Sequence, residues 1–501
     1  MHSQGALTMT GVVEGFYGPP WSWHDRLDVL QWCAARGLTD YVYAPKDDPK
    51  HRTEWREPYD DEELAGFRSL VERSGLRIGV AISPGLSIDD VSTSDRASLL
   101  AKIRPLVDLG VVHVGLFLDD LPPDRERSRA RRGVDHAALT SWLWEHLGPD
   151  VLTSLVPTEY IGTAPSPYLE GLASNLPAEI PIGWTGASVV NDEITTTEAR
   201  SRADALGGRP PLLWDNVPVN DAVMSDRLFM GPLRGRAPEL RDLCAGYLAN
   251  PMVQARASML PLASIASWCT AGDPESGWHA AAEELGWRTF AEACDGAVPQ
   301  RLVRDLIAEA DGPGWTAAAN ALASWLAAAT DCGAPGLEDE AAPWLAQTRE
   351  EAALARRALS LFRRTRPSVE PVSANEWRAV VPDPDDVLAR AFAVSASWPA
   401  VRRAVPCVFG PRLAVRPAVR QSGSGAWVWR ADAIEEDESA TDDLVRLALD
   451  AAASLDPGAT LTVHVDGELV GTGNEVTFTA RPGCIVLARH GSMLHRVRVE
   501  S

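Results

Sequence analysis

The feature that most constrains the fold of this chain is an alternation of short apolar runs and helical stretches, which extends from residue 11 to residue 268. The apolar runs are GVVEGFY (11–17), DYVYAPK (40–46), RIGVAIS (77–83), VGLFLDD (114–120), LTSLVPTEY (152–160), IPIGWTG (180–186), PLLWDN (211–216) and a weaker one, SMLPLASIA (258–266). Strands that alternate with helices are typical of a parallel sheet with helices outside it. Eight such units within roughly 260 residues predict a (β/α)8 barrel, or TIM barrel, of the α/β class. An open doubly wound sheet is the alternative that this periodicity leaves.

The character of the sequence changes beyond about residue 290. Segments rich in Ala, Leu and Arg at helical spacing predict a helical domain, and the Pro-rich stretch 366–386 predicts a boundary after it. Strand-like runs follow, with a predicted hairpin turn at Asp466-Gly467. We therefore expect a (β/α)8 domain at 1–290, a helical domain at 291–365 and a small C-terminal α+β or β-rich module at 366–501, to which the sequence assigns no role.

Charge and cysteine content narrow the possible partners. The chain has 47 Lys and Arg residues against 69 Asp and Glu residues, a net charge of −22, which disfavours binding to nucleic acid and to anionic membranes. No apolar run is long enough to cross a bilayer, and the first residues lack the basic and apolar regions of a secretory signal. The seven cysteines are scattered and include no C-x-x-C pair. Because this pattern fits free thiols in a reducing compartment, we expect a cytoplasmic protein.

Polar and aromatic residues follow the predicted strands, at the end of the barrel where the active sites of this fold lie. The pair Asp119-Asp120 is the most informative of them. Successive side chains of a strand point to opposite faces, so both carboxylates reach one pocket only where the strand ends. Two carboxylates at one site suppress each other's ionisation, which leaves one to stabilise positive charge and the other to donate a proton. The alternative is that one aspartate caps the next helix or pairs with an arginine of the segment 125–132.

Seven motifs accompany this pair in a fixed order: GVVEGFYGPPW, YVYAPKDDPKHRTEWREPY, AISPGL, LFLDDL, PTEYIGT, WTG and WDNVPVND. Together they resemble glycoside hydrolase family 84, whose members include protein O-GlcNAc hydrolases and bacterial β-N-acetylglucosaminidases often labelled hyaluronidases. The resemblance covers about residues 8–270 and does not extend to the C-terminal module. Seven ordered motifs make it far more specific than a single short pattern.

The resemblance implies a retaining exo-β-N-acetylglucosaminidase that removes β-linked N-acetylglucosamine (GlcNAc) from glycoproteins or glycoconjugates. Members of the family use substrate-assisted catalysis through an oxazoline intermediate, in which the acetamido group of the sugar is the nucleophile. Asp119 matches the residue that holds the acetamido N–H and stabilises the oxazoline. Asp120 matches the general acid and base. This chemistry needs no cofactor.

The resemblance also implies roles for residues around the two aspartates. Tyr160 matches a tyrosine that hydrogen-bonds the acetamido oxygen. Asn216 matches an asparagine that orients the catalytic carboxylate and the acetamido group, and Trp214 matches a wall of the N-acetyl pocket. Four further residues match the group that binds the sugar hydroxyls: Gly15, Lys46, Asp221 and Asn250.

Each of these readings has an alternative. Lys46, Asp47 and Asp48 could form a surface ion-pair cluster. Asp47, Asp48 and His51 suggest a metal site, but they lack a closed ligand set, so we expect no metal. The rival functions are a catalytically inactive GlcNAc-binding protein and a hyaluronidase acting on glycosaminoglycan fragments. The sequence leaves the natural substrate open among a modified protein, a cell-wall fragment and a glycosaminoglycan, and it permits a homodimer through the helical domain.

Overall fold

The structure is a computed structural model of the 501-residue chain. It describes residues 7–88, 92–121, 127–309 and 313–364, together with eight strands between residues 418 and 498. The chain divides into two compact units. One comprises Met1–Ala222 and Phe229–Glu284, and the other comprises Val223–Leu228 and Leu285–Ser501.

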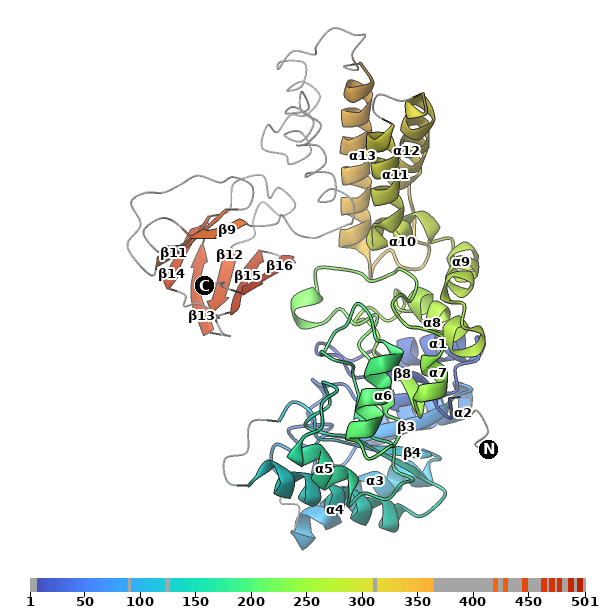
Figure 1. Cartoon of the computed structure of the whole chain (residues 1–501), viewed down its shortest axis with the longest axis vertical. Helices are drawn as coiled ribbons and strands as arrows, with labels where there is room; N and C mark the ends of the chain where they lie inside the picture. Colours follow the sequence, from blue (N-terminus) through green and yellow to red (C-terminus); the bar gives the residue numbers. More distant parts are fainter. Residues whose placement is uncertain are drawn as a thin grey trace. The chain divides into compact units, whose positions relative to one another are not determined.

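The first unit is a (β/α)8 barrel (Figure 1). Its eight strands are all parallel and are hydrogen-bonded in the order β5-β4-β3-β2-β1-β8-β7-β6. They are β1 (Thr10–Glu14), β2 (Asp40–Tyr43), β3 (Arg77–Ile82), β4 (His113–Phe117), β5 (Leu152–Val156), β6 (Gly183–Trp184), β7 (Leu212–Asp215) and β8 (Gly246–Ala249). A parallel bridge between Leu155 in β5 and Ile182, which directly precedes β6, joins the two ends of this order. The predicted TIM barrel is therefore confirmed, and the open sheet is excluded.

Helices connect the strands on the outside of the barrel. Those between strands are α1 (Trp23–Ala34), α2 (Asp61–Arg73), α3 (Thr93–Asp108), α4 (Arg129–Leu147), α5 (Pro167–Ala173), α6 (Thr196–Ala205) and α7 (Leu240–Leu243), while α8 (Met259–Ala271) and α9 (Pro274–Leu285) follow β8. The 3-10 helix η1 (Ala222–Met224) falls where the chain passes from the first unit to the second. Helices α1 to α6 all begin at a Ser, Thr or Asp whose side chain accepts a backbone N–H of the first turn. These caps satisfy amide groups that have no partner within the helix and so fix where each helix starts.

The inside of the barrel is filled by apolar side chains from several strands. The buried cluster consists of Met9, Val13, Val42, Ala44, Ala81, Phe117, Val156, Leu212, Trp214 and Leu248. Tyr160 packs against it and is only partly buried. Because these side chains fill the interior of the barrel, a ligand can reach barrel residues only at the ends of the strands.

The predicted strand at 258–266 is wrong, because α8 covers these residues and the eighth strand is β8. A short apolar run cannot be told from a buried helix by its periodicity. The residues from Leu260 to Ala266 are all buried, so this part of the helix has no exposed polar face. Pro261 lies in the first turn of α8, where a missing N–H is tolerated.

The second unit contains helices and strands. The helices are α10 (Arg288–Asp295), α11 (Ala297–Ala308), α12 (Trp315–Thr330) and α13 (Ala342–Arg364). Helices α11, α12 and α13 lie side by side (Figure 1). They share one buried cluster, which includes Leu306, Leu322 and Leu359. No helix among the described residues is long and apolar enough to cross a membrane.

Eight strands follow in two four-stranded sheets, ordered β14-β11-β10-β9 and β13-β12-β15-β16. They are β9 (Ala418–Gln421), β10 (Trp427–Arg430), β11 (Leu444–Ala448), β12 (Leu461–Val465), β13 (Glu468–Gly473), β14 (Glu475–Thr479), β15 (Ile485–His490) and β16 (Met493–Arg498). Strands β12 and β13 pair antiparallel on either side of the predicted turn, but Asp466-Gly467 itself lies outside the described residues, as does the predicted boundary 366–386.

Candidate active site

Asp119 lies just beyond the end of β4 and is almost completely buried, with 5% of its surface exposed. The ammonium of Lys46, from the loop after β2, donates to Oδ2 of Asp119. The other oxygen, Oδ1, is buried and has no hydrogen-bond partner among the residues that the structure describes. Buried polar atoms are nearly always paired in native proteins, so an unpaired carboxylate oxygen here is suited to accept a donor from a bound molecule.

Asp120 has different surroundings, although it is the next residue. Its φ of 52° is left-handed, a conformation that residues other than glycine adopt rarely. The hydroxyl of Tyr17 donates to its Oδ2 at 2.9 Å, and the hydroxyl of Tyr160 donates to its Oδ1 at 2.8 Å. The carboxylate of Asp119 therefore lies against a cation, and that of Asp120 lies between two neutral phenols.

The two phenols titrate far above neutrality. Burial raises the pKa of Tyr17 to about 12, and the charge of Asp120 adds to this effect while Arg52 opposes it. Burial and the charge of Asp120 also raise the pKa of Tyr160 well above its ordinary value. Both hydroxyls thus keep their protons at neutral pH and remain hydrogen-bond donors.

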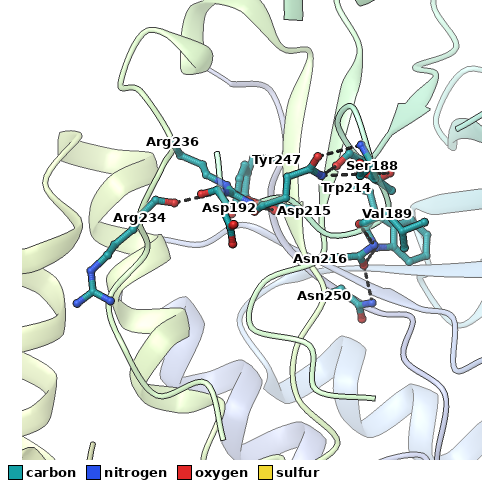
Figure 2. A network of polar contacts seen from close by, with 12 residues as sticks. Ser188, Val189, Asp192, Trp214, Asp215, Asn216, Arg234, Arg236, Tyr247 and Asn250 are labelled. Carbon is teal, nitrogen blue, oxygen red and sulfur yellow. Dashed lines mark hydrogen bonds and ion pairs between the residues drawn. The ribbon is translucent and has the colours of Figure 1, made fainter. Parts of the chain in front are cut away.

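A second group of polar residues lies at the ends of β7 and β8 (Figure 2). The side-chain oxygen of Asn216 accepts from Trp214 Nε1 and from Asn250 Nδ2, both at 2.9 Å. The amide nitrogen of Asn216 donates to the carbonyl of Val189 at 2.7 Å, which ties the loop after β6 to this group. Asn250 Oδ1 in turn accepts the backbone N–H of Gly15 at 3.0 Å. Four strand ends are therefore joined by a single hydrogen-bond network.

Gly15 and Trp214 lie in direct contact. A Cβ atom on Gly15 would be 2.3 Å from Cζ2 of Trp214, so no other residue fits without moving the indole. The indole also packs on Phe117, with ring centroids 5.2 Å apart. The Trp214 indole, the predicted wall of the pocket, therefore packs against Phe117 of the barrel core on one side and against Gly15 on the other.

Asp221 holds the loop after β1. Its Oδ2 accepts the backbone N–H of Tyr17 at 2.7 Å, and Asp47 Oδ2 accepts the N–H of the next residue, Gly18, at 2.8 Å. Burial raises the pKa of Asp221 above its ordinary value; the hydrogen bond from Tyr17 opposes this, and the charges of Asp120 and Asp47 add to it.

Two further strand-end carboxylates belong to the scaffold. Glu14, the last residue of β1, is fully buried and accepts from Arg26 Nε at 2.8 Å. Asp215, the last residue of β7, accepts from Arg236 through both oxygens at 2.8 Å (Figure 2). Bidentate buried pairs of this kind fix the strand ends on which the neighbouring site residues stand.

The structure decides against several alternative readings. Lys46 is only 5% exposed and contacts Asp119, so it is not part of a surface cluster. The N-cap of α4 is Ser128 and neither aspartate of the pair, and Arg127, Arg129 and Arg131 pair with other acids. Within the described residues no group of three or more His, Cys, Asp or Glu side chains could hold a metal ion.

All nine predicted site residues thus lie around the carboxyl ends of the barrel strands. Hydrogen bonds place eight of them in two sets. One set consists of Asp119, Asp120, Lys46 and Tyr160, and the other of Gly15, Trp214, Asn216 and Asn250. Asp221 joins neither set, because its hydrogen bond is to the backbone N–H of Tyr17 in the loop after β1. Sequence analysis missed Tyr17 and Arg52. The only signal for them was their place within the quoted motifs: Tyr17 ends the predicted strand 11–17, and Arg52 lies in the segment that follows the predicted strand 40–46.

Comparisons with known proteins point to one family. A family model described as beta-N-acetylglucosaminidase matches residues 10–296. The Protein O-GlcNAcase of Rattus norvegicus and that of Mus musculus are each 34% identical to this chain over 275 residues, which is 52% of this chain but 30% of theirs. The chain thus matches under a third of the length of these curated relatives.

A solved structure of a mutant of the Thermobaculum terrenum O-GlcNAc hydrolase is similar over 80% of this chain and 94% of that one, with a TM-score of 0.66 and 26% identity. The similarity therefore extends beyond the barrel. Because the family model matches more than half of the chain, the chain belongs to the β-N-acetylglucosaminidase family, glycoside hydrolase family 84.

Proposed function

We propose that the protein is a retaining exo-β-N-acetylglucosaminidase that releases β-linked GlcNAc by substrate-assisted catalysis. The observation that carries the proposal is the pair of adjacent carboxylates in unlike surroundings. Asp119 presents a buried oxygen with no partner among the described residues, and Asp120 is held between two phenols. The names of the relatives, O-GlcNAcase and O-GlcNAc hydrolase, agree with this chemistry.

In the first step, the free Oδ1 of Asp119 accepts the acetamido N–H of the sugar. This orients the acetamido oxygen for attack on C1 and stabilises the positive charge of the oxazoline. Asp120 gives a proton to the departing glycosidic oxygen. In the second step Asp120 takes a proton from water, which opens the oxazoline from the other face. Each step inverts C1, so the configuration is retained overall.

The surrounding residues complete the site in this proposal. Tyr160, which donates to Asp120 in the structure, would turn its hydroxyl to the acetamido oxygen when the sugar binds. Trp214 would cover the acetamido methyl group, with Asn216 fixing the indole. Lys46, Asp221, Asn250 and the backbone at Gly15 would bind the sugar hydroxyls. Buried hydrogen bonds to hydroxyls discriminate strongly, because a sugar without them leaves polar groups unpaired.

An activity assay with a fluorogenic β-N-acetylglucosaminide tests this function. We expect turnover with retention of the anomeric configuration in the first product seen by NMR, and almost none with the matching β-glucoside. Asp119→Asn should slow good and poor leaving groups alike, because both need the nucleophile. Brisk hydrolysis of the glucoside would exclude substrate assistance, and binding of GlcNAc without turnover would favour the inactive binding protein.

The exposed surface beside the site favours a protein as the natural substrate. Six large hydrophobic side chains are exposed in the described residues, and five follow barrel strands at the end that carries the site: Tyr17, Leu86, Ile161, Val189 and Val190. Val189 is linked through its carbonyl to Asn216. Exposed apolar side chains on the loops beside the site favour a polypeptide over a polyanion such as hyaluronan, which the net charge of −22 also repels.

Rates of GlcNAc release from a glycopeptide, a muropeptide and hyaluronan oligomers compare these substrates directly. The glycopeptide should be preferred, and the double variant Val189→Ser/Val190→Ser should lose that preference while keeping its activity on the fluorogenic substrate. A preference for hyaluronan oligomers would support the hyaluronidase alternative.

Localisation and assembly complete the proposal. The five cysteines in the described residues are free thiols, which suits a reducing cytoplasm. Alkylation of intact cells before lysis tests this, since disulfides at these positions would contradict it. The homodimer through the helical domain remains a prediction, and light scattering of the full chain measures it.

A further inference from the structure

Arg52 reaches the general acid from the loop between β2 and α2. Its Nη2 donates to the backbone carbonyl of Asp120 at 3.2 Å, and its Nη1 donates to the hydroxyl of Tyr17 at 2.8 Å. One guanidinium therefore contacts Asp120 directly and, through Tyr17, contacts its carboxylate as well.

The direct contact acts on the backbone. Asp120 is one of two residues other than glycine with positive φ among the described residues. Such a conformation persists only where surrounding contacts hold it. The preceding segment is anchored, because Leu118 donates its N–H to Val156 and accepts Thr158 Oγ1 on its carbonyl. At the turn itself, Arg52 Nη2 donates a hydrogen bond to the Asp120 carbonyl.

The contact through Tyr17 fixes the direction in which the Tyr17 hydroxyl donates its proton. A phenol has one proton to donate, and the Tyr17 oxygen accepts from Arg52. Its proton is therefore left for Asp120 Oδ2. A guanidinium always donates, so this direction does not change during the reaction.

Arg52 does not have the contacts of an ordinary surface arginine. It is half-buried, and its Nε is buried with no hydrogen-bond partner among the described residues. Burial would lower the pKa of Arg52, but its bond to Tyr17 and the charges of Asp119 and Asp120 raise it above its ordinary value. The cation is thus maintained at a place where its desolvation is costly.

We propose that Arg52 is a positioning residue for Asp120: it holds the left-handed turn through the Asp120 carbonyl and orients the Tyr17 hydroxyl toward the Asp120 carboxylate. This rests on the proposed function, because it deepens the role of Asp120 as acid and base. Arg52 acts through Asp120 and Tyr17.

The test compares Arg52→Gln and Arg52→Lys with Arg56→Gln. Arg56 anchors the same loop, but its hydrogen bonds go to Asp95 and Ser87 and not to Asp120 or Tyr17. For a substrate with a poor leaving group, such as a GlcNAc-serine peptide, both Arg52 variants should lose about 30- to 300-fold in kcat with little change in KM. For an activated phenol the loss should be about threefold or less, because it needs little protonation. Arg56→Gln should keep both rates.

A double-mutant cycle checks the route through Tyr17. Arg52→Gln and Tyr17→Phe should be less than additive on the poor leaving group, because each removes the same orientation. Equal losses for both leaving groups, full additivity, or an equal loss in Arg56→Gln would overturn the proposal.

A crystal structure of Arg52→Gln separates this proposal from the proposed function. Asp120 should leave the left-handed region and lose its bond to Tyr17, whether or not the wild type hydrolyses the sugar. An unchanged Asp120 overturns the positioning role, and an inactive wild type overturns only the function. Arg52→Lys serves the same purpose should the glutamine variant not fold.

Discussion

Asp119 and Asp120 show how adjacent residues of one type acquire different properties. Asp119 continues inward from β4 and meets Lys46, whereas the positive φ of Asp120 redirects its side chain to two phenols. A left-handed residue other than glycine costs about 1–3 kcal/mol, which the contacts around it must offset. Strain of this size at a strand end is common where function requires a particular side-chain direction.

Asp120→Asn tests the acid role without disturbing this backbone, because asparagine tolerates the left-handed region. We expect the rate for a poor leaving group to fall about 10²- to 10⁴-fold, the usual contribution of general acid–base catalysis. The rate for an activated phenol should fall far less in the step that forms the oxazoline. Steady-state and burst kinetics on a series of aryl β-N-acetylglucosaminides measure this, and a uniform decrease would remove the acid assignment.

Gly15→Ala tests the close packing of the Trp214 indole against Gly15. The new Cβ would lie 2.3 Å from Trp214 Cζ2, so the indole must shift. We expect a loss of about 1–3 kcal/mol in the free energy of unfolding, typical of overpacking, together with a raised KM. Gly333→Ala is the matched control, because nothing lies within 4 Å of its Cβ. Urea unfolding and initial rates measure both, and equal behaviour of the two variants would contradict a close fit at Gly15.

Elements differ in how clearly the sequence specifies them. The apolar runs that became β1 to β5 and β7 are bounded by turns and polar residues, and each was predicted within a few residues. Strand β8 has only four residues, and the longer apolar run of α8 follows it, so the residues of α8 were predicted as the eighth strand.

Tyr17 and Arg52 were missed for a related reason. Their partner, Asp120, is about 100 and 70 residues away in the chain, and no local pattern encodes such a contact.

The pair of Asp215 and Arg236 holds β7 beneath the site, and Arg236→Met tests it. Both side chains are 1% exposed, so removing the cation leaves a buried charge without its partner. We expect a loss of about 3–5 kcal/mol in the free energy of unfolding. Arg236 also donates to the carbonyls of Asn191 and Asp192, close to Val189, so activity should fall as well.

Arg131→Met is the control for this pair, because the Arg131 side chain is 65% exposed and its partner Asp135, which is 11% exposed, keeps a second ion pair with Arg127. It should cost no more than about 1 kcal/mol. Urea denaturation of the three proteins gives the comparison. Similar losses in both variants would show that burial of the Asp215 pair is not what stabilises the strand end.

At the scale of the whole molecule, the barrel followed from the number and spacing of strand–helix units, because each unit must bury its apolar face against the next. The C-terminal region gave no comparable period. Strand content could be predicted there, but the parallel pairing of β10 with β11 within one sheet and the separate sheet around β12 could not. Such pairings depend on contacts between distant segments and not on local alternation.

The pH dependence of stability is also a property of the whole fold, and two buried histidines contribute to it. Burial lowers the pKa of His51 to about 3 and that of His113 to about 4; Lys46 adds to the effect at His51 and Arg77 at His113. The unfolded chain, with an ordinary histidine pKa near about 6.5, then binds more protons than the folded one at acid pH. Each histidine thus contributes stability that is complete above about pH 6.5 and is lost as the pH falls toward its folded pKa.

Between pH 7.5 and pH 5.5 this loss amounts to about 1.4 kcal/mol for each histidine, because a tenfold change in protonation is worth that much. His113→Gln keeps an amide that can bond to Ser154, the present partner of Nε2 at 2.7 Å, but cannot bind a proton. Its stability should therefore fall by about 1.4 kcal/mol less than that of the wild type over this interval. His24→Gln, at a side chain that is 74% exposed, should follow the wild type. Urea unfolding at the two pH values measures the difference, and parallel curves for the wild type and His113→Gln would show that folding does not lower the pKa of His113.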